Sequence, residues 1–441
     1  MWDRLKLFLT FRDSRFEDLT KDNFRSVVYR DASAGLVTAM TAIPMAMGFA
    51  MAMGLRPEQG LIAGAMACLI GRTFGGSKYQ VYGPTAAFIP LIYAIMQKYD
   101  HGFLVAASAI AGVVLCVMGL FGMGKVAKYV PNSIIVGFTV GIGITIAATN
   151  IYDVLGITAN GGPNLITKLS GVVEHAGSAS VYAIVLGLLV FGLTRYLLRL
   201  SIYIPAPLIA VGVATGIASY IWSDKQLNLV STKYGSIPTN FFVFTPPSLP
   251  AMTSEVAMDL AYFVVAIAFI SGVESLLCSS MADRLAGNTK TPFNPDKEFW
   301  GQGLVQIITP LINGFPCTGA LARTATSIRA GAVTPLAGYF KAAFKLGMVL
   351  FLTHFLELVP MACIGGVMLW VSSNMIKVSE MKHVWATGKF HGALMIYTAI
   401  MVPATDFLTG VLSALVLYFA LRPFLEPMAK SEAVSNEEVA A

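Results

Sequence analysis

Two short stretches decide how this chain folds, because each interrupts a long apolar region with glycine and proline. The first reads Tyr82-Gly83-Pro84-Thr85-Ala86-Ala87, and the second reads Phe315-Pro316-Cys317-Thr318-Gly319-Ala320-Leu321-Ala322-Arg323. A regular helix does not accommodate glycine and proline at this density. Each stretch therefore predicts an extended lead that ends where a helix begins. Two such helix N-termini meeting inside a membrane would present free N–H groups and positive dipole ends, which favour an anion. An ordinary helix kink is the alternative for either stretch taken alone.

The composition around these stretches is that of a membrane protein. Of the 441 residues, 56% are hydrophobic and 12% are charged, and the mean hydropathy is +0.70. Soluble domains carry roughly a quarter charged residues, so a soluble enzyme and a disordered chain are both excluded. The 41 glycines and 21 prolines are typical of membrane helices that break and pack closely. We therefore expect an all-α polytopic membrane protein.

The cysteines and histidines give no sign of catalysis or of a metal site. The cysteines form no CxxC pair, and the histidines are scattered without metal-ligand spacing. We expect no enzyme activity, no metal, no disulfide, no cofactor and no nucleic-acid partner.

A membrane-spanning helix needs about 20 apolar residues. On this basis the apolar runs predict fourteen transmembrane segments, near residues 32–53, 58–75, 81–97, 102–121, 129–152, 178–198, 203–222, 257–281, 299–312, 318–330, 336–356, 361–376, 391–402 and 405–422. The charge-free run over 299–322 is divided in two because Pro310, Gly314, Pro316 and Gly319 interrupt it.

The positions of the basic residues predict the orientation of these segments. With a cytoplasmic N-terminus, the outside loops contain only five basic residues: Arg56, Lys98, Lys168, Lys225 and Lys233. Nearly all the others, including Lys341 and Lys345 near a span end, fall on the cytoplasmic side, as the positive-inside rule requires. We expect an integral plasma (inner) membrane protein with both termini in the cytoplasm. An amphipathic N-terminal helix is expected on the membrane surface through Trp2, Leu5, Phe8, Leu9 and Phe11.

Fourteen segments divide into two halves of seven, and an odd repeat places the second copy upside down. The broken segment is the third in each half, which is the pattern of secondary transporters built from inverted repeats. The expected organisation is a cytoplasmic N-terminal segment, a first repeat, an extracellular linker, a second repeat and a short cytoplasmic tail, over residues 1–30, 31–223, 224–256, 257–422 and 423–441 respectively.

Two charged residues stand out inside the predicted membrane region. Arg323 lies a few residues into the second half-helix, where it is expected to provide positive charge for an anion; a cap or a snorkelling side chain is the alternative. Glu274 lies deep in the eighth segment. It is expected to carry a coupling ion, H⁺ or Na⁺, and a structural ion pair with Arg323 is the alternative.

Several motifs occur in order and resemble the SulP family of anion transporters, whose animal members include pendrin and prestin. They are Ala42-Ile43-Pro44 with Phe49, Pro57-Glu58-Gln59-Gly60, Phe74-Gly75-Gly76-Ser77-Lys78, Gly83-Pro84-Thr85-Ala86-Ala87, Glu274-Ser275-Leu276-Leu277, Gly301-Gln302-Gly303-Leu304, Thr318-Gly319-Ala320-Leu321-Ala322-Arg323-Thr324, Arg329-Ala330-Gly331-Ala332 and Thr334-Pro335-Leu336-Ala337-Gly338. The resemblance covers most of the first ten segments, and the pattern of spans extends it to about residue 422.

The resemblance implies a seven-plus-seven inverted repeat with core and gate domains, elevator-like alternating access and half-helices at segments 3 and 10. It implies substrate contacts at Phe49, Thr85, Ala86, Ala320, Leu321, Ala322 and Arg323. It also implies that Glu274 is the proton or Na⁺ coupling site and leaves a homodimer open. Two features depart from the family pattern: Met45 stands where the family often has glutamine, and only a short tail stands where it usually has a STAS domain.

The leading functional hypothesis is a secondary active transporter of sulfate or bicarbonate. An uncoupled anion channel or exchanger, including a voltage-responsive form, and a dicarboxylate transporter are the alternatives. The titratable Glu274 favours coupled transport over a passive pore. A nucleobase transporter of the same fold is disfavoured, because a neutral base has no need of the fixed charge of Arg323.

Overall fold

The computed structural model is almost entirely helical and describes residues 2–10, 13–124, 131–158, 165–238, 240, 242–405 and 408–422. The predicted tail at 423–441 lies outside the described residues, as do Phe11 and the side chain of Trp2.

One group of helices packs around the two broken segments. It comprises α2 (Phe24–Ala52), α3 (Pro57–Phe74), α4 (Ile89–Lys98), α5 (His101–Leu120), α11 (Ser254–Ala286), α12 (Pro295–Leu311), α13 (Leu321–Arg329) and α14 (Leu336–Glu357). In this group α12 packs on α5 and α3, α14 packs on α2 and α3, and α11 packs on α5 and α13. We call it the first helix group.

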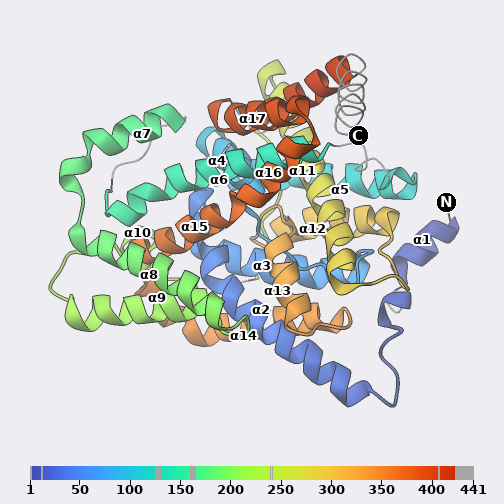
Figure 1. Ribbon diagram of the computed structural model, residues 1–441, viewed down its shortest axis with the longest axis horizontal. Helices are drawn as coiled ribbons and strands as arrows, with labels where there is room; N and C mark the ends of the chain where they lie inside the picture. The colour runs from blue at the N-terminus through green and yellow to red at the C-terminus, as the bar shows by residue number, and fades with distance from the viewer. Residues whose placement is uncertain are drawn as a thin grey trace, which may run out of the picture.

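The second helix group comprises α6 (Asn132–Leu155), α8 (Val181–Leu200), α9 (Ala206–Gly216), α15 (Met361–Met375) and α17 (Lys389–Ala404). Here α6 packs on α15 and α17, and α8 packs on α9 and α15. In Figure 1, α8 and α9 lie at the left and α5 and α12 at the right. Helix α2 contacts both groups, because it packs on α14 and α3 and also on α15 and α9.

Shorter helices connect or flank the two groups. They are α1 (Trp2–Leu9), α7 (Leu165–Glu174), α10 (Val230–Tyr234) and α16 (Val378–Thr387), with a last apolar helix over Leu408–Arg422. Polar caps and prolines set several helix starts. Asp100 accepts from the Phe103 N–H at 2.8 Å before α5, and Asn294 accepts from two N–H groups before α12.

The longer helices fall in the ranges of the predicted segments, whereas α1, α7, α10 and α16 lie outside them. Seven helices within the described residues are long and apolar enough to cross a membrane. The predicted division of 299–322 is confirmed, because α12 ends at Leu311 and α13 begins at Leu321. The total of fourteen spans and the inverted relation of the two halves stay predictions.

The two broken segments are joined by backbone hydrogen bonds at the centre of the first helix group. Strand β1 (Tyr82–Gly83) pairs antiparallel with β2 (Thr318–Gly319), with Tyr82 opposite Gly319 and Gly83 opposite Thr318. Both strands lie within the two stretches that predict an extended lead, and the ladder forms where the two glycines allow close approach.

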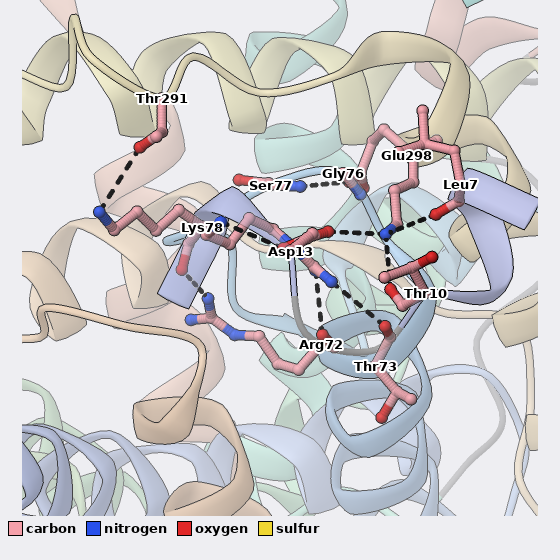
Figure 2. Close-up of polar contacts among 12 residues, drawn as sticks. Leu7, Thr10, Asp13, Arg72, Thr73, Gly76, Ser77, Lys78, Thr291 and Glu298 are labelled. Carbon is pink, nitrogen blue, oxygen red and sulfur yellow. Dashed lines mark hydrogen bonds and ion pairs between the residues drawn. The ribbon is translucent and has the colours of Figure 1, made fainter. Parts of the chain in front are cut away.

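The N-terminal segment is bound to the protein by polar contacts, which Figure 2 shows around Asp13. Lys297 Nζ donates to the carbonyls of Leu7 (3.2 Å) and Thr10 (3.0 Å) and pairs with Asp13 Oδ2 at 2.6 Å. The expectation that Phe8 lies on the membrane surface is wrong: its side chain is 1% exposed and packs on the Trp300 ring at 5.8 Å. Leu9 remains exposed and Leu5 is half-buried.

Candidate functional site

The candidate site lies where the two strands lead into two helix starts. Strand β1 is followed by a 3-10 turn over Ala86–Phe88 and then α4, while β2 leads directly into α13. Neither the turn nor α13 has a side chain capping its first N–H groups. The Ala320 N–H donates to the Val81 carbonyl at 2.9 Å, which fixes the second helix start against the first strand. Helix starts without caps offer N–H donors to an anion.

Arg323 lies in the first turn of α13 and reaches back to the first broken segment. Its side chain is 3% exposed, and Nη2 donates to the Pro84 carbonyl. Nη1 is buried without a hydrogen-bond partner among the described residues. It lies so close to Gly83 that a Cβ added there would stand 2.9 Å from it. A buried guanidinium with an unused donor is a group that an anion would satisfy.

Glu274 of α11 contacts the start of the first half-helix. The Thr85 hydroxyl donates to Glu274 Oε2 at 3.0 Å. No ion pair joins Glu274 to Arg323 in the described part of the chain, and each has its own hydrogen-bond partner: the Thr85 hydroxyl for Glu274 and the Pro84 carbonyl for Arg323. Glu274 is half-buried, and its protonation or occupation by a cation would be felt directly at Thr85.

The other candidate residues differ in how far the structure buries them. Phe49, Ala86 and Ala320 are buried, together with Thr85 and Arg323. Leu321 is half-buried, and Ala322 is exposed. Met45, where the family pattern often has glutamine, is buried and offers no hydrogen-bond donor.

A buried polar network behind β1 holds the site in place, and its centre is Glu298 of α12. This carboxylate accepts from the Tyr82 hydroxyl at 2.8 Å, Ser275 Oγ at 2.5 Å and Gln80 Nε2 at 2.8 Å. It also accepts the N–H groups of Gly76 and Ser77 at 2.9 and 3.1 Å (Figure 2). One carboxylate therefore links the α3–β1 loop to α11 and α12.

Two glutamines of α12 support the second broken segment in the same way. The Cys317 carbonyl accepts from Gln302 Nε2 at 2.5 Å and from Gln306 Nε2 at 2.8 Å. Gln302 belongs to the Gly301-Gln302-Gly303 motif, so one role of this motif is to bind the backbone of the second broken segment. Both strands of the ladder are thus held from α12.

Lys341 and Lys345 of α14 lie where the sequence pattern does not place them. That pattern places both near the cytoplasmic span end, but each is 0% exposed. Lys341 Nζ donates to the Tyr82 carbonyl at 2.9 Å, and Lys345 Nζ donates to the Gly60 carbonyl at 3.3 Å. The correction has a physical reason: a long side chain on α14 can reach the free carbonyls beside the broken segment.

Sequence reasoning missed Glu298, Gln80 and the two lysines as members of this region. Glu298 stands at the edge of an apolar run, where a charge is ordinarily solvated. The lysines carried one usable signal, because they stand four residues apart in an otherwise apolar segment and therefore share one helix face. No cluster of three metal-ligating side chains occurs among the described residues.

Comparison with known proteins identifies the relatives of this chain. The sequence matches the sulfate permease family over residues 28–398. YvdB of Bacillus subtilis, which bears a provisional name as a sulfate transporter, is 33% identical over 93% of this chain and 76% of its own length. The bicarbonate transporter BicA of Picosynechococcus is 27% identical over 87% of this chain and 67% of its own length.

Solved structures share the fold. The transmembrane domain of a cyanobacterial bicarbonate transporter BicA superposes with a TM-score of 0.76 at 23% identity, covering 90% of this chain and 98% of that one. The murine Slc26a9 anion transporter in the inward-facing state superposes with a TM-score of 0.83 at 17% identity, covering 96% of this chain and 72% of that one.

These likenesses extend over both helix groups and include the two broken segments. The relatives are transporters and not enzymes, as the composition predicted. The chain is an integral membrane protein and belongs to the sulfate permease family of anion transporters.

Proposed function

We propose that this chain is a secondary active transporter of a small inorganic anion, sulfate or bicarbonate. The observation that carries the proposal is the buried Arg323 guanidinium, which has an unused donor beside Gly83 where the two broken segments meet. The uncapped starts of the 3-10 turn and α13 add backbone donors nearby. The names of YvdB and BicA support these two anions as the first to test.

Coupling is proposed to run through Glu274, with H⁺ favoured over Na⁺. Its hydrogen bond to Thr85 supports the proposal, because it links the carboxylate to the backbone segment that would hold the anion. A lone carboxylate can take up a proton without an organised set of oxygen ligands, whereas Na⁺ needs such a set. Neutralising Glu274 leaves more of the positive field of Arg323 for the anion, so the two ligands bind cooperatively.

Alternating access is proposed to be elevator-like. The first helix group would act as the core that carries the anion, and the second as the gate against which it moves. The division of helix contacts supports this assignment, since α2 is the principal helix that packs on both groups. Fourteen spans in two inverted repeats, cytoplasmic termini, the plasma (inner) membrane and a homodimer complete the proposal.

The test is uptake by proteoliposomes that contain the purified chain. Labelled sulfate and bicarbonate are offered under an inward proton gradient, an inward Na⁺ gradient or neither, and Arg323→Ala liposomes serve as the reference. Accumulation above equilibrium that requires one gradient supports coupled transport. Uptake that follows only the anion's own gradient would instead indicate an uncoupled channel or exchanger, and selective uptake of dicarboxylates would change the substrate.

A further inference from the structure

We propose that Lys341 and Lys345 set the charge of the anion that this site accepts, so that it prefers a dianion of the sulfate class to a monoanion. The inference deepens the proposed transport function and rests on it. Neither lysine belongs to the expected set of substrate contacts, and both act through their charge.

The two lysines contact segments that border the candidate site. They are one helical turn apart on α14 and are fully buried against β1 and α3 through the carbonyls of Tyr82 and Gly60. Lys345 Nζ lies next to Gly64, because a Cβ added at Gly64 would collide with it. Gly64 in turn packs close to Gly83, and Arg323 Nη1 also lies next to Gly83. Lys341 joins this region through the carbonyl of Tyr82, so three cationic side chains lie close to Gly83.

None of these three cations forms an ion pair with a carboxylate among the described residues. The carboxylates nearby are each bound by other donors. Glu274 accepts from Thr85, and Glu298 accepts from Tyr82, Ser275 and Gln80. Asp31 accepts from the N–H of Val333 and from Thr334, and Glu58 at the start of α3 pairs with Arg56. The positive charge at the site is therefore not neutralised by direct contact.

The balance of charge around the strand pair points to the valence of the ligand. Arg323, Lys341 and Lys345 donate to carbonyls at or beside the segment 82–85. Glu298 and Glu274 accept from the Tyr82 and Thr85 hydroxyls of that segment, so three cations stand against two carboxylates in direct contact with it. A proton or Na⁺ on Glu274 raises the excess from one positive charge to two. Uncompensated charge inside a membrane protein costs several kcal/mol. A dianion removes the excess of the loaded site completely, whereas a monoanion leaves one charge unmatched.

A purely structural role would be to tie α14 to the carbonyls of Tyr82 and Gly60. An amide side chain can also donate a hydrogen bond but carries no charge, so lysine-to-glutamine variants separate the two roles. Coulomb energy is proportional to the charge of the ligand. If removal of one cation lowers the affinity for a monoanion by a given factor, it should therefore lower the affinity for a dianion by the square of that factor.

The experiment is calorimetric titration of the purified full chain in detergent with sulfate, nitrate and bicarbonate at one pH. It compares the wild type with Lys341→Gln and Lys345→Gln. Lys168→Gln is the matched control, because Lys168 is also buried and bonds Thr149 at 3.0 Å, but it lies on α7 against α6. Gel filtration and thermal unfolding check that each variant is folded. If a glutamine variant does not fold, Lys341→Met or Lys345→Met is used at the same position.

We expect the wild type to prefer sulfate. Lys341→Gln and Lys345→Gln should each lower the affinity for sulfate about tenfold or more and the affinity for nitrate about threefold. Lys168→Gln should leave both affinities unchanged. Equal factors for sulfate and nitrate, or a wild type without preference for sulfate, would overturn the role of the lysines while leaving anion transport intact. Absence of any anion binding in the wild type would overturn the transport proposal itself.

Discussion

The Thr85 hydroxyl donates a 3.0 Å hydrogen bond to Oε2 of Glu274. This contact joins the first half-helix to α11, which lies far away in the sequence. It places the only carboxylate predicted for coupling in direct contact with a residue predicted for substrate binding. The contact leads to the first prediction.

Glu274→Gln should separate anion exchange from coupled uptake. Glutamine resembles the protonated side chain and can still accept from Thr85, so the site keeps its shape. Proteoliposomes with this variant are expected to exchange labelled anion at a rate near that of the wild type. They should lose accumulation driven by the cation gradient. Gradient-driven accumulation at the wild-type rate would show that coupling runs elsewhere.

Arg323→Ala should weaken anion binding more than Arg323→Lys. The alanine variant removes the buried positive charge and the unused Nη1 donor, whereas lysine retains the charge without the planar fork. Loss of a hydrogen bond to a charged group corresponds to roughly 1.5–3 kcal/mol, or about ten- to a hundredfold in affinity. Competition of unlabelled against labelled sulfate in liposomes measures the change. Identical affinity in the alanine variant and the wild type would exclude a role for this residue.

Gly319→Ala should disrupt the ladder between the broken segments. A Cβ at this position would stand 2.5 Å from Gln80 Cδ, and Gln80 is fixed by its bonds to Ser275, Ser279 and Glu298. Transport is expected to fall sharply while membrane insertion persists. Gly347→Ala on α14 is the control, since its added Cβ would meet nothing within 4 Å. Equal uptake by both variants would mean that close approach at Gly319 is unnecessary.

Glu298→Gln should destabilise the protein even though Glu298 is not proposed to touch the anion. An amide cannot replace a carboxylate that accepts from five donors, so the unfolding free energy should fall by roughly 2 kcal/mol. Thermal unfolding in detergent measures the loss. Glu255→Gln is the control, because Glu255 is 71% exposed and its ion pair is with an exposed lysine at the surface. A variant as stable as this control would contradict the prediction.

The N-terminal segment should detach in acid because it is held through Asp13. Burial would raise the pKa of Asp13, but the hydrogen bonds and charges of Arg15 and Lys297 outweigh it and lower that pKa below its ordinary value of 3.8. The stabilisation is thus fully present above pH 3.8 and is lost as the pH falls through the lowered value. Hydrogen exchange over residues 13–22 should rise in that range.

The Asp13→Asn variant provides the complementary measurement at neutral pH. It removes the charge that pairs with Lys297 at 2.6 Å, so the same residues should exchange faster than in the wild type at pH 7. Asp22→Asn, on the same segment, serves as the control. Protection that is unchanged in Asp13→Asn would show that the backbone contacts of Lys297 suffice to hold the segment.

The membrane class, the ranges of the longer helices and the position of the two breaks follow from the sequence alone. They depend on local composition: long apolar runs need a bilayer, and the glycines and prolines between Tyr82 and Ala87 and between Gly314 and Gly319 interrupt the helices. Arg323 and Glu274 could also be identified as candidate functional residues from the sequence, because a charge in a long apolar run is energetically costly.

Only the tertiary structure decided how these elements meet. The pairing of Tyr82 with Gly319, the five donors around Glu298 and the burial of Lys341 and Lys345 join residues hundreds of positions apart in the sequence or from different helices. A lysine near a span end has the same local sequence whether it snorkels to water or turns inward. Which of the two occurs depends on the free carbonyls beside the broken segment, and those are brought within reach only when α14 packs on α3.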